Sequence, residues 1–210
     1  MTRRIVPILV AAVLAVPQGA RAAVSIEGFY GLSRPPSADF SQAVSGAANN
    51  PDLIASSLNI AGGDLIFHLG VLELGAIIDT SWKSGSASQT AIGGLIGLGT
   101  DMGGWLRLEA LGEVGGQRYG NFANNPNIVT SSSSQEWLMY VGLRPGVAWR
   151  MAAGDSDRTG IIFGLWGYAR WDLTTSNVPV TVGSAGSTSP GSVKLGGTTV
   201  GAELRLGFEF

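Results

Sequence analysis

The sequence predicts an all-β fold, an antiparallel up-and-down β-barrel of eight strands. The final stretch, residues 200–210, alternates strictly between apolar and polar side chains, which is the period of a strand with one apolar face. The same alternation recurs along the chain in segments of about ten residues, separated by runs rich in Gly, Pro, Asn and Ser. The composition is also unusual, because 32 of the 210 residues are Gly and only 13% are charged, against about 25% in a typical soluble domain.

The first 22 residues have the features of a cleaved export signal. Two arginines precede an apolar run over residues 5–16, and Ala20-Arg21-Ala22 fits a small-x-small cleavage site. The apolar run is shorter than the ~20 residues that a transmembrane helix needs. We therefore expect a signal peptide over residues 1–22 and a single barrel domain over residues 23–210.

The composition also excludes several classes of site and partner. The chain has no cysteine, so it has no disulfide, no thiolate metal site and no cysteine nucleophile. Its formal net charge is -2, and the predicted cleavage removes three arginines, so the mature chain is acidic. A protein that binds phosphate groups needs a basic face. Nucleic acid is therefore not an expected partner.

The first half of the mature chain predicts four strands. Residues 24–32 alternate and are followed by a long loop over residues 33–56, which is rich in Ser, Pro, Ala and Asn. Two further strands, over residues 57–68 and 72–82, are joined by a tight turn. The fourth strand, over residues 89–99, is rich in Gly, and its pattern does not decide which face points inward.

The second half predicts four more strands, which brings the total to an even number. Pro145 lies in one of them and cannot donate a ladder hydrogen bond, so we expect a bulge or a strand end nearby. The expected strands cover residues 105–119, 135–150, 160–171 and 200–210, and the expected long loops cover residues 120–134 and 172–194.

One face of the predicted strands carries charged side chains of both signs. Charges that are removed from water need partners, and about eight strands leave an interior that holds only side chains. We therefore expect an ion-pair network that fills the barrel interior. Its expected members are Glu27, Asp64, Glu73, Asp79, Arg107, Glu109, Glu113, Glu136, Arg144, Arg170, Glu203 and Arg205.

The opposite face is apolar and ends in aromatic residues. Trp137 and Trp149 share this face of one strand, ~40 Å apart at ~3.3 Å per residue. With a tilt of about 40°, this length projects to about 30 Å, close to the apolar band of a membrane barrel with its aromatic girdles. The pattern therefore predicts a transmembrane barrel. Its expected interface belt is Trp82, Trp137, Trp149, Trp171 and Phe210.

The terminal strand, which ends in Phe210 after apolar residues at alternate positions, resembles the last strand of bacterial outer-membrane β-barrels. The mature chain resembles the small OmpA/OmpX-type proteins, without the peptidoglycan-binding domain that follows some relatives. This resemblance implies an integral outer-membrane location. It also implies contact with outer-membrane lipid and lipopolysaccharide, and recognition of Phe210 by the barrel-assembly machinery. A soluble β-sandwich or lipocalin-like barrel is the alternative, but it explains neither the interface tryptophans nor the terminal Phe.

Three other features suggest chemistry less strongly. His68 is the only histidine, and some outer-membrane barrels modify lipid A with His and Ser, but no Ser stands at an obvious partnering position. The Gly-rich stretch 94–99 lacks the helix that follows a nucleotide-binding loop. Asp155 and Asp157 offer too few carboxylates for a calcium site. We therefore expect no metal, cofactor or catalytic residue.

Three functions are compatible with such a barrel. We favour a role in membrane structure or surface interaction, in which the loops 33–56, 120–134 and 172–194 meet an extracellular ligand. A narrow pore or a path for small apolar molecules is the first alternative. A lipid A-modifying enzyme is the second.

Overall fold

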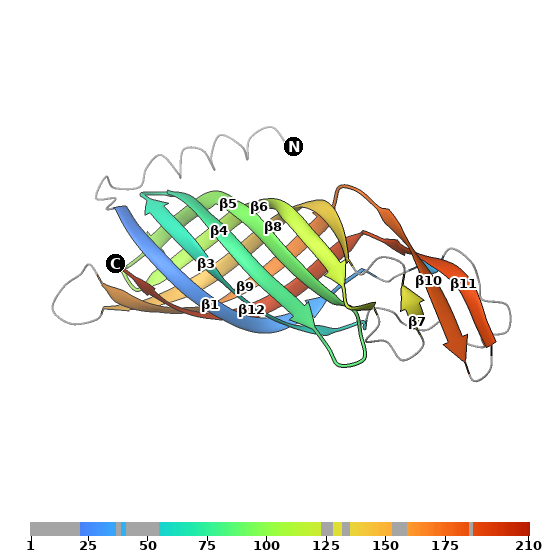
Figure 1. Ribbon diagram of the computed structural model, residues 1–210. Coiled ribbons are helices and arrows are strands. Elements are labelled where there is room, and N and C mark those ends of the chain that lie inside the picture. Colours follow the sequence, from blue (N-terminus) through green and yellow to red (C-terminus); the bar gives the residue numbers. More distant parts are fainter. Residues whose placement is uncertain are drawn as a thin grey trace, which may run out of the picture.

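The computed structural model describes residues 22–36, 39–40, 55–122, 128–131, 135–152, 159–184 and 187–210. Eight long strands close into a barrel, and four shorter strands form a second sheet beyond one end of it (Figure 1). The fold class predicted from the sequence is confirmed. No helix in the described part of the chain is long and apolar enough to cross a membrane. The predicted signal peptide lies outside the described residues, apart from Ala22 in the first strand.

Each barrel strand pairs antiparallel with the next barrel strand of the sequence, and β1 also pairs with β12 to close the sheet. The closing seam reaches the last residue, because Val24 and Phe210 exchange two backbone hydrogen bonds of 2.9 and 3.0 Å. Closure leaves no unpaired edge, which is what a sheet needs in hydrocarbon. The barrel strands are β1 (Ala22–Arg34), β3 (Leu58–Leu69), β4 (Leu72–Trp82), β5 (Ser88–Met102), β6 (Leu106–Gly120), β8 (Gln135–Ala152), β9 (Gly160–Asp172) and β12 (Thr198–Glu209).

The two ends of the barrel differ. Ala22 and Phe210 lie at the end that we call the terminus end, together with the tight turns between β3 and β4 and between β5 and β6 (Figure 1). Gly70, Gly103 and Gly104 form these turns with φ values of 73°, 71° and 77°, which side chains other than Gly rarely adopt. The β8–β9 connection is at the same end. The opposite end, which we call the loop end, carries the short β4–β5 connection and the three longest ones, between β1 and β3, β6 and β8, and β9 and β12.

The strands alternate between an exposed apolar outer face and a buried inner face. The structure also decides the facing of β5, which the sequence left open. Gln89, Ala91 and Leu95 point inward, whereas Ile92 and Ile96 lie on the outer face. Because Gly fills many intervening positions of this strand, the sequence pattern alone carried too few side chains to show the period.

The bulge or strand end expected near Pro145 is absent from β8. Pairing with β9 is interrupted at Arg144 and Pro145, but it continues in the same register from Gly146. The pairing of β8 with β6 runs without a shift through Pro145. The proline therefore removes ladder bonds on one side without displacing the strand.

The segments that the sequence predicted to be long loops contain four further strands. They form a sheet in the order β2-β11-β10-β7, which extends beyond the loop end (Figure 1). The alternating Val178, Val180 and Val182 were a signal for β10, and Pro179 obscured it. The strands are β2 (Asp39–Phe40), β7 (Ile128–Ser131), β10 (Ser176–Ser184) and β11 (Ser187–Leu195).

Candidate functional site

The interior of the barrel concentrates the chemistry of this chain. It contains a central ion-pair network, a cluster around the single histidine at the terminus end, and an apolar cluster at the loop end. Alternation along eight strands places all three inside the barrel, because every second side chain of each strand points to the axis.

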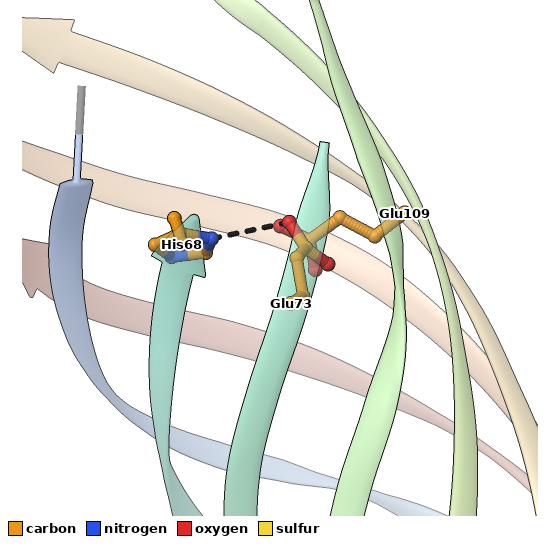
Figure 2. A group of neighbouring side chains, drawn as sticks. All are labelled: His68, Glu73 and Glu109. Atoms are coloured by element: carbon orange, nitrogen blue, oxygen red, sulfur yellow. Dashed lines mark hydrogen bonds and ion pairs between the residues drawn. The ribbon is translucent and has the colours of Figure 1, made fainter. Parts of the chain in front are cut away.

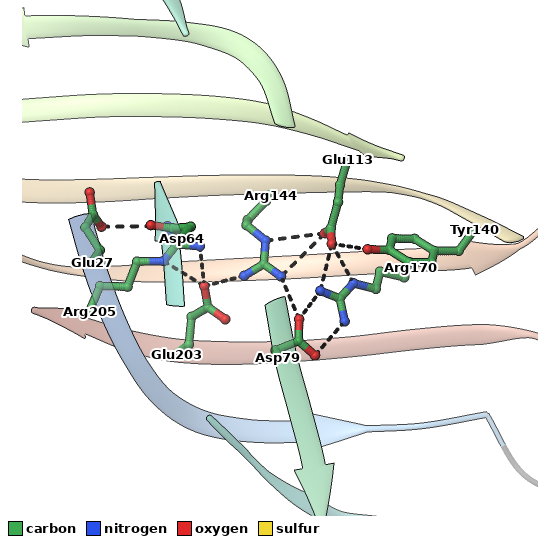
Figure 3. A network of polar contacts seen from close by, with 9 residues as sticks. All are labelled: Glu27, Asp64, Asp79, Glu113, Tyr140, Arg144, Arg170, Glu203 and Arg205. Atoms are coloured by element: carbon green, nitrogen blue, oxygen red, sulfur yellow. Dashed lines mark hydrogen bonds and ion pairs between the residues drawn. The ribbon is translucent and has the colours of Figure 1, made fainter. Parts of the chain in front are cut away.

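Arg170 on β9 links two carboxylates at the centre of the interior (Figure 3). Its Nη1 donates to Asp79 Oδ1 at 3.1 Å, Nη2 donates to Asp79 Oδ2, and Nε donates to Glu113 Oε1 at 3.1 Å. The Tyr140 hydroxyl donates to the same Glu113 oxygen at 2.5 Å. One guanidinium thus bridges the buried carboxylates of Asp79 and Glu113.

Two further arginines extend this network (Figure 3). Arg144 pairs with Glu203, and Arg205 pairs with both Glu203 and Asp64, with 2.6 Å between Arg205 Nη2 and Glu203 Oε1. The guanidinium of Arg205 also lies 4.6 Å from the ring centroid of the inward-facing Trp166. Arg suits this environment because its planar group combines several hydrogen bonds with stacking on rings.

The cluster at the terminus end contains His68, Glu73, Arg107 and Glu109, which lie on β3, β4 and β6. His68, Glu73 and Glu109 point toward one another in Figure 2. Arg107 Nη2 lies 2.6 Å from Glu73 Oε1, and Arg107 Nε lies 3.1 Å from Glu109 Oε1. One guanidinium therefore serves two buried carboxylates.

His68 lies between Arg107 and Glu73 on one side of its ring and Ser25 on the other. Its Nδ1 lies 2.7 Å from Arg107 Nη2 and 3.1 Å from Glu73 Oε1. Its Nε2 lies 3.0 Å from Ser25 Oγ. Ser25 in turn donates to Glu27 Oε1 at 3.0 Å. These contacts form a continuous polar chain from Arg107 through His68 and Ser25 to Glu27.

Ser25 is the spatial partner of His68 that the sequence did not reveal, because the two residues are distant in the chain and adjacent only in the β1–β3 pairing. Ser25, His68 and Glu73 lie in line as a serine, a histidine and an acid do in a hydrolase. The direction of one hydrogen bond differs, however, because the Ser25 hydroxyl donates to Glu27 and not to His68.

The loop end of the interior is closed by an apolar cluster, which we call the plug. It joins residues of the barrel wall to the inward side of the β10–β11 hairpin. All of its members are almost fully buried, so the mouth of the barrel is packed with side chains. The plug consists of Leu58, Ala87, Tyr119, Phe122, Leu138, Val178, Val193 and Leu195.

A polar latch holds the base of the same hairpin. The Asp172 carboxylate accepts hydrogen bonds from Gln117 Nε2 at 2.5 Å, from the Tyr119 hydroxyl at 2.9 Å and from the Gly197 amide at 3.0 Å. The Asp172 amide also donates to the Gly197 carbonyl at 2.9 Å. These bonds fix the position at which the hairpin leaves β9 and returns to β12.

The structure brings together all but one of the charged residues that the sequence assigned to the interior. Glu136 has the expected inward parity, but it is only partly buried near the loop end of β8, and no ion pair of the described residues includes it. Glu209, which was not among the expected members, forms an ion pair with Arg150, with 2.7 Å between Arg150 Nε and Glu209 Oε1. Its alternation with Glu203 and Arg205 in β12 was the signal that could have found it.

The predicted belt residues lie on the outer surface. Trp82, Trp137 and Trp171 are exposed at the loop end, and Phe210 is exposed at the terminus end. Trp149, also at the terminus end, is partly covered by Phe163, with 5.5 Å between stacked ring centroids. A further residue, Trp105, is exposed in the β5–β6 turn and was not part of the predicted belt. Asp155 and Asp157 lie outside the described residues.

Similar folds occur among solved structures. No protein-family model matches the chain, and no curated protein matches it. The outer membrane protein OprG of Pseudomonas aeruginosa is 10% identical with a TM-score of 0.50, over 90% of this chain and 95% of that chain. The N-terminal β-barrel domain of OprF from the same organism is 15% identical with a TM-score of 0.43, over 90% and 97% of the two chains. Neisserial surface protein A is 11% identical with a TM-score of 0.44, over 90% and 98%. At these identities the likeness concerns the fold, and this chain has the closed eight-stranded barrel fold that OprG has.

Proposed function

We propose that this chain is an integral outer-membrane protein in which the barrel is a closed scaffold and the β2-β11-β10-β7 sheet is the interaction surface. The observation that carries the proposal is the filled interior, with buried ion pairs at the centre and an apolar plug at the loop end. A barrel with this interior offers its outside and its ends to other molecules. Among the described residues, this sheet is the second sheet of the molecule and lies outside the barrel wall.

The outer face supports the membrane location. Large apolar side chains, among them Ile78, Leu143 and Leu204, are exposed around the barrel. In water, a continuous apolar surface of this kind leads to association, whereas in hydrocarbon it is the ordinary surface of a barrel. Exposed tryptophans at both ends fit the two interfaces of a bilayer.

The topology supports an orientation. Outer-membrane barrels have short periplasmic turns and longer external loops. In that case the terminus end faces the periplasm, and the β2-β11-β10-β7 sheet projects from the outer surface of the cell. In this orientation the outer face contacts lipid and lipopolysaccharide, the assembly machinery meets the strand that ends in Phe210, and an extracellular ligand meets the sheet.

Single-cysteine labelling tests location and orientation together. The chain has no cysteine, so each variant carries one reactive thiol. Asn177→Cys lies on the exposed side of β10, and Met102→Cys lies at the terminus end of β5. In intact cells a membrane-impermeant maleimide should label the first variant, and it should label the second only after the outer membrane is permeabilised.

Labelling of both variants after denaturation controls for their presence. Labelling of Met102→Cys but not Asn177→Cys in intact cells would contradict the orientation, and recovery of the chain in the soluble fraction would contradict the location. The closed scaffold is tested separately in planar bilayers. The folded protein should give no steady conductance, and a stable open pore would overturn this part of the proposal.

A further inference from the structure

Negative charge exceeds positive charge in the described part of the barrel interior. Eight carboxylates are buried, against four buried arginines. Arg150 is only partly buried and pairs with Glu209. A carboxylate removed from water needs a cation, a proton or several donors. The interior therefore has capacity for additional positive charge.

The excess is concentrated near His68. His68, Glu73 and Glu109 each present a ligand atom, and these atoms lie within 4.8 Å of one another (Figure 2). The Oε2 atoms of Glu73 and Glu109 are buried and have no hydrogen-bond partner among the described residues. One imidazole and two carboxylates form a donor set that suits first-row divalent metals such as Zn²⁺.

The two ring nitrogens of His68 have different surroundings. Its Nδ1 is the nitrogen that faces Glu73, 3.1 Å from Oε1, and its Nε2 lies 3.0 Å from Ser25 Oγ, which donates to Glu27. Metal-binding histidines almost always donate their second ring N–H to an oxygen, and this bond fixes the tautomer and the orientation of the ring. In this cluster Ser25 occupies the second nitrogen, Nε2, and Nδ1 is the nitrogen that faces the carboxylates.

Arg107 is the internal cation of this cluster and has other partners within reach. Its guanidinium contacts Glu73, Glu109 and His68. Its Nη1 also lies 3.5 Å from Asp101 Oδ1 and 3.8 Å from Glu209 Oε2, and Asp101 is largely exposed at the terminus end. A short movement toward Asp101 would keep Arg107 paired and release the oxygens of Glu73 and Glu109.

We propose that His68, Glu73 and Glu109 bind a divalent transition metal, with Zn²⁺ as the best-matched ion. The metal enters from the terminus end and replaces the Arg107 guanidinium, which moves to Asp101 and Glu209. The ion supplies the positive charge that the interior lacks. Arg107 is the competing cation, so its removal should strengthen metal binding.

Calorimetric titration of the folded full-length protein in detergent with Zn²⁺ tests the site. His68→Gln and Glu109→Gln should each weaken Zn²⁺ binding at least about tenfold, because each removes one ligand, and Ser25→Ala should weaken it about tenfold through the histidine. Glu113→Gln is the matched control, since Glu113 is also a buried, ion-paired glutamate on the inner face of β6. Its Zn²⁺ affinity should equal that of the unchanged protein.

Arg107→Gln provides a test with the opposite sign. It should bind Zn²⁺ more tightly than the unchanged protein, whereas a purely structural cluster would lose order and any affinity with it. If Arg107→Gln does not fold, the comparison of Glu109→Gln with Glu113→Gln still decides the site. No Zn²⁺ binding by the unchanged protein would overturn the proposal, as would equal losses in Glu109→Gln and Glu113→Gln.

Discussion

At the scale of single residues, the interior arginines are the main partners of the buried carboxylates. Each is buried against at least two carboxylates, so the removal of one leaves several charges without compensation. A buried ion pair contributes little when it is compared with a well-packed apolar replacement of both partners. Breaking such a pair by removing one partner is costly, because the remaining charge stays in a dry environment.

Arg170→Met should lower the free energy of unfolding by about 3–5 kcal/mol, because Asp79 and Glu113 lose their main partner. Urea unfolding of the protein in lipid vesicles measures this change. Arg34→Met is the control, since Arg34 is exposed at the end of β1, and its effect should be within about 0.5 kcal/mol. Equal effects of the two variants would contradict the central role of the Arg170 network.

The same substitution should change the stability of the barrel differently at two glycines of β1. A Cβ on Gly31 would collide with the backbone of Ala202 and Glu203, whereas a Cβ on Gly28 would have no atom closer than 3.9 Å. Gly31→Ala should therefore destabilise the barrel by more than about 1 kcal/mol, while Gly28→Ala should be neutral or slightly stabilising, since Ala restricts the unfolded chain. The urea midpoints of the two variants test this difference. Similar midpoints would contradict it, since they would show that β12 can move away from a Cβ at residue 31 without loss of stability.

At the scale of elements, the β10–β11 hairpin is the feature that distinguishes this barrel end. Its side chains pack into the mouth through the plug, and its base is held by the Asp172 latch. The apolar contacts of the plug hold the side chains of the hairpin, whereas the Asp172 hydrogen bonds hold its base. Loss of the latch should therefore loosen the hairpin while the barrel remains intact.

Asp172→Ala should increase hydrogen exchange of the β10 and β11 amides, since Gln117 and Tyr119 are left with unsatisfied groups at about 1–3 kcal/mol each. Exchange in the barrel strands should change little. Lys194→Ala is the control on the same hairpin, because Lys194 is exposed and its removal should leave exchange unchanged. Uniform exchange changes throughout the barrel in Asp172→Ala would contradict a local latch.

At the scale of the whole molecule, the central network and the plug occupy different parts of the interior and share no residue. Deletion of residues 176–195 removes β10 and β11 and opens the plug, but leaves Arg144, Arg170 and Arg205 with their carboxylates. The shortened chain should still fold, with the heat-modifiable mobility on gels that folded barrels show, and should remain non-conducting in planar bilayers. A conducting barrel after this deletion would show that the hairpin alone closes the interior.

The sequence determined the barrel and the composition of its interior. Alternation of period two places each side chain on one face or the other, and an eight-stranded closed sheet leaves no other place for the buried charges. For this reason the facing of seven strands and the inward position of residues such as Asp79, Arg144 and Glu203 followed from the pattern. The facing of β5 did not, because its glycines carry no side chain to reveal a period.

Only the tertiary structure decided which groups meet. The pairing of β1 with β3 places Ser25 beside His68, and the stagger of strands around the barrel places Glu73 of β4 beside Arg107 of β6. The β10–β11 hairpin pairs with β2 and β7 in a sheet and packs against the barrel mouth, and both contacts are with distant segments of the chain. Period two fixes the face of a residue, whereas register and barrel closure fix its neighbours, and these depend on contacts between strands that no single stretch of sequence contains.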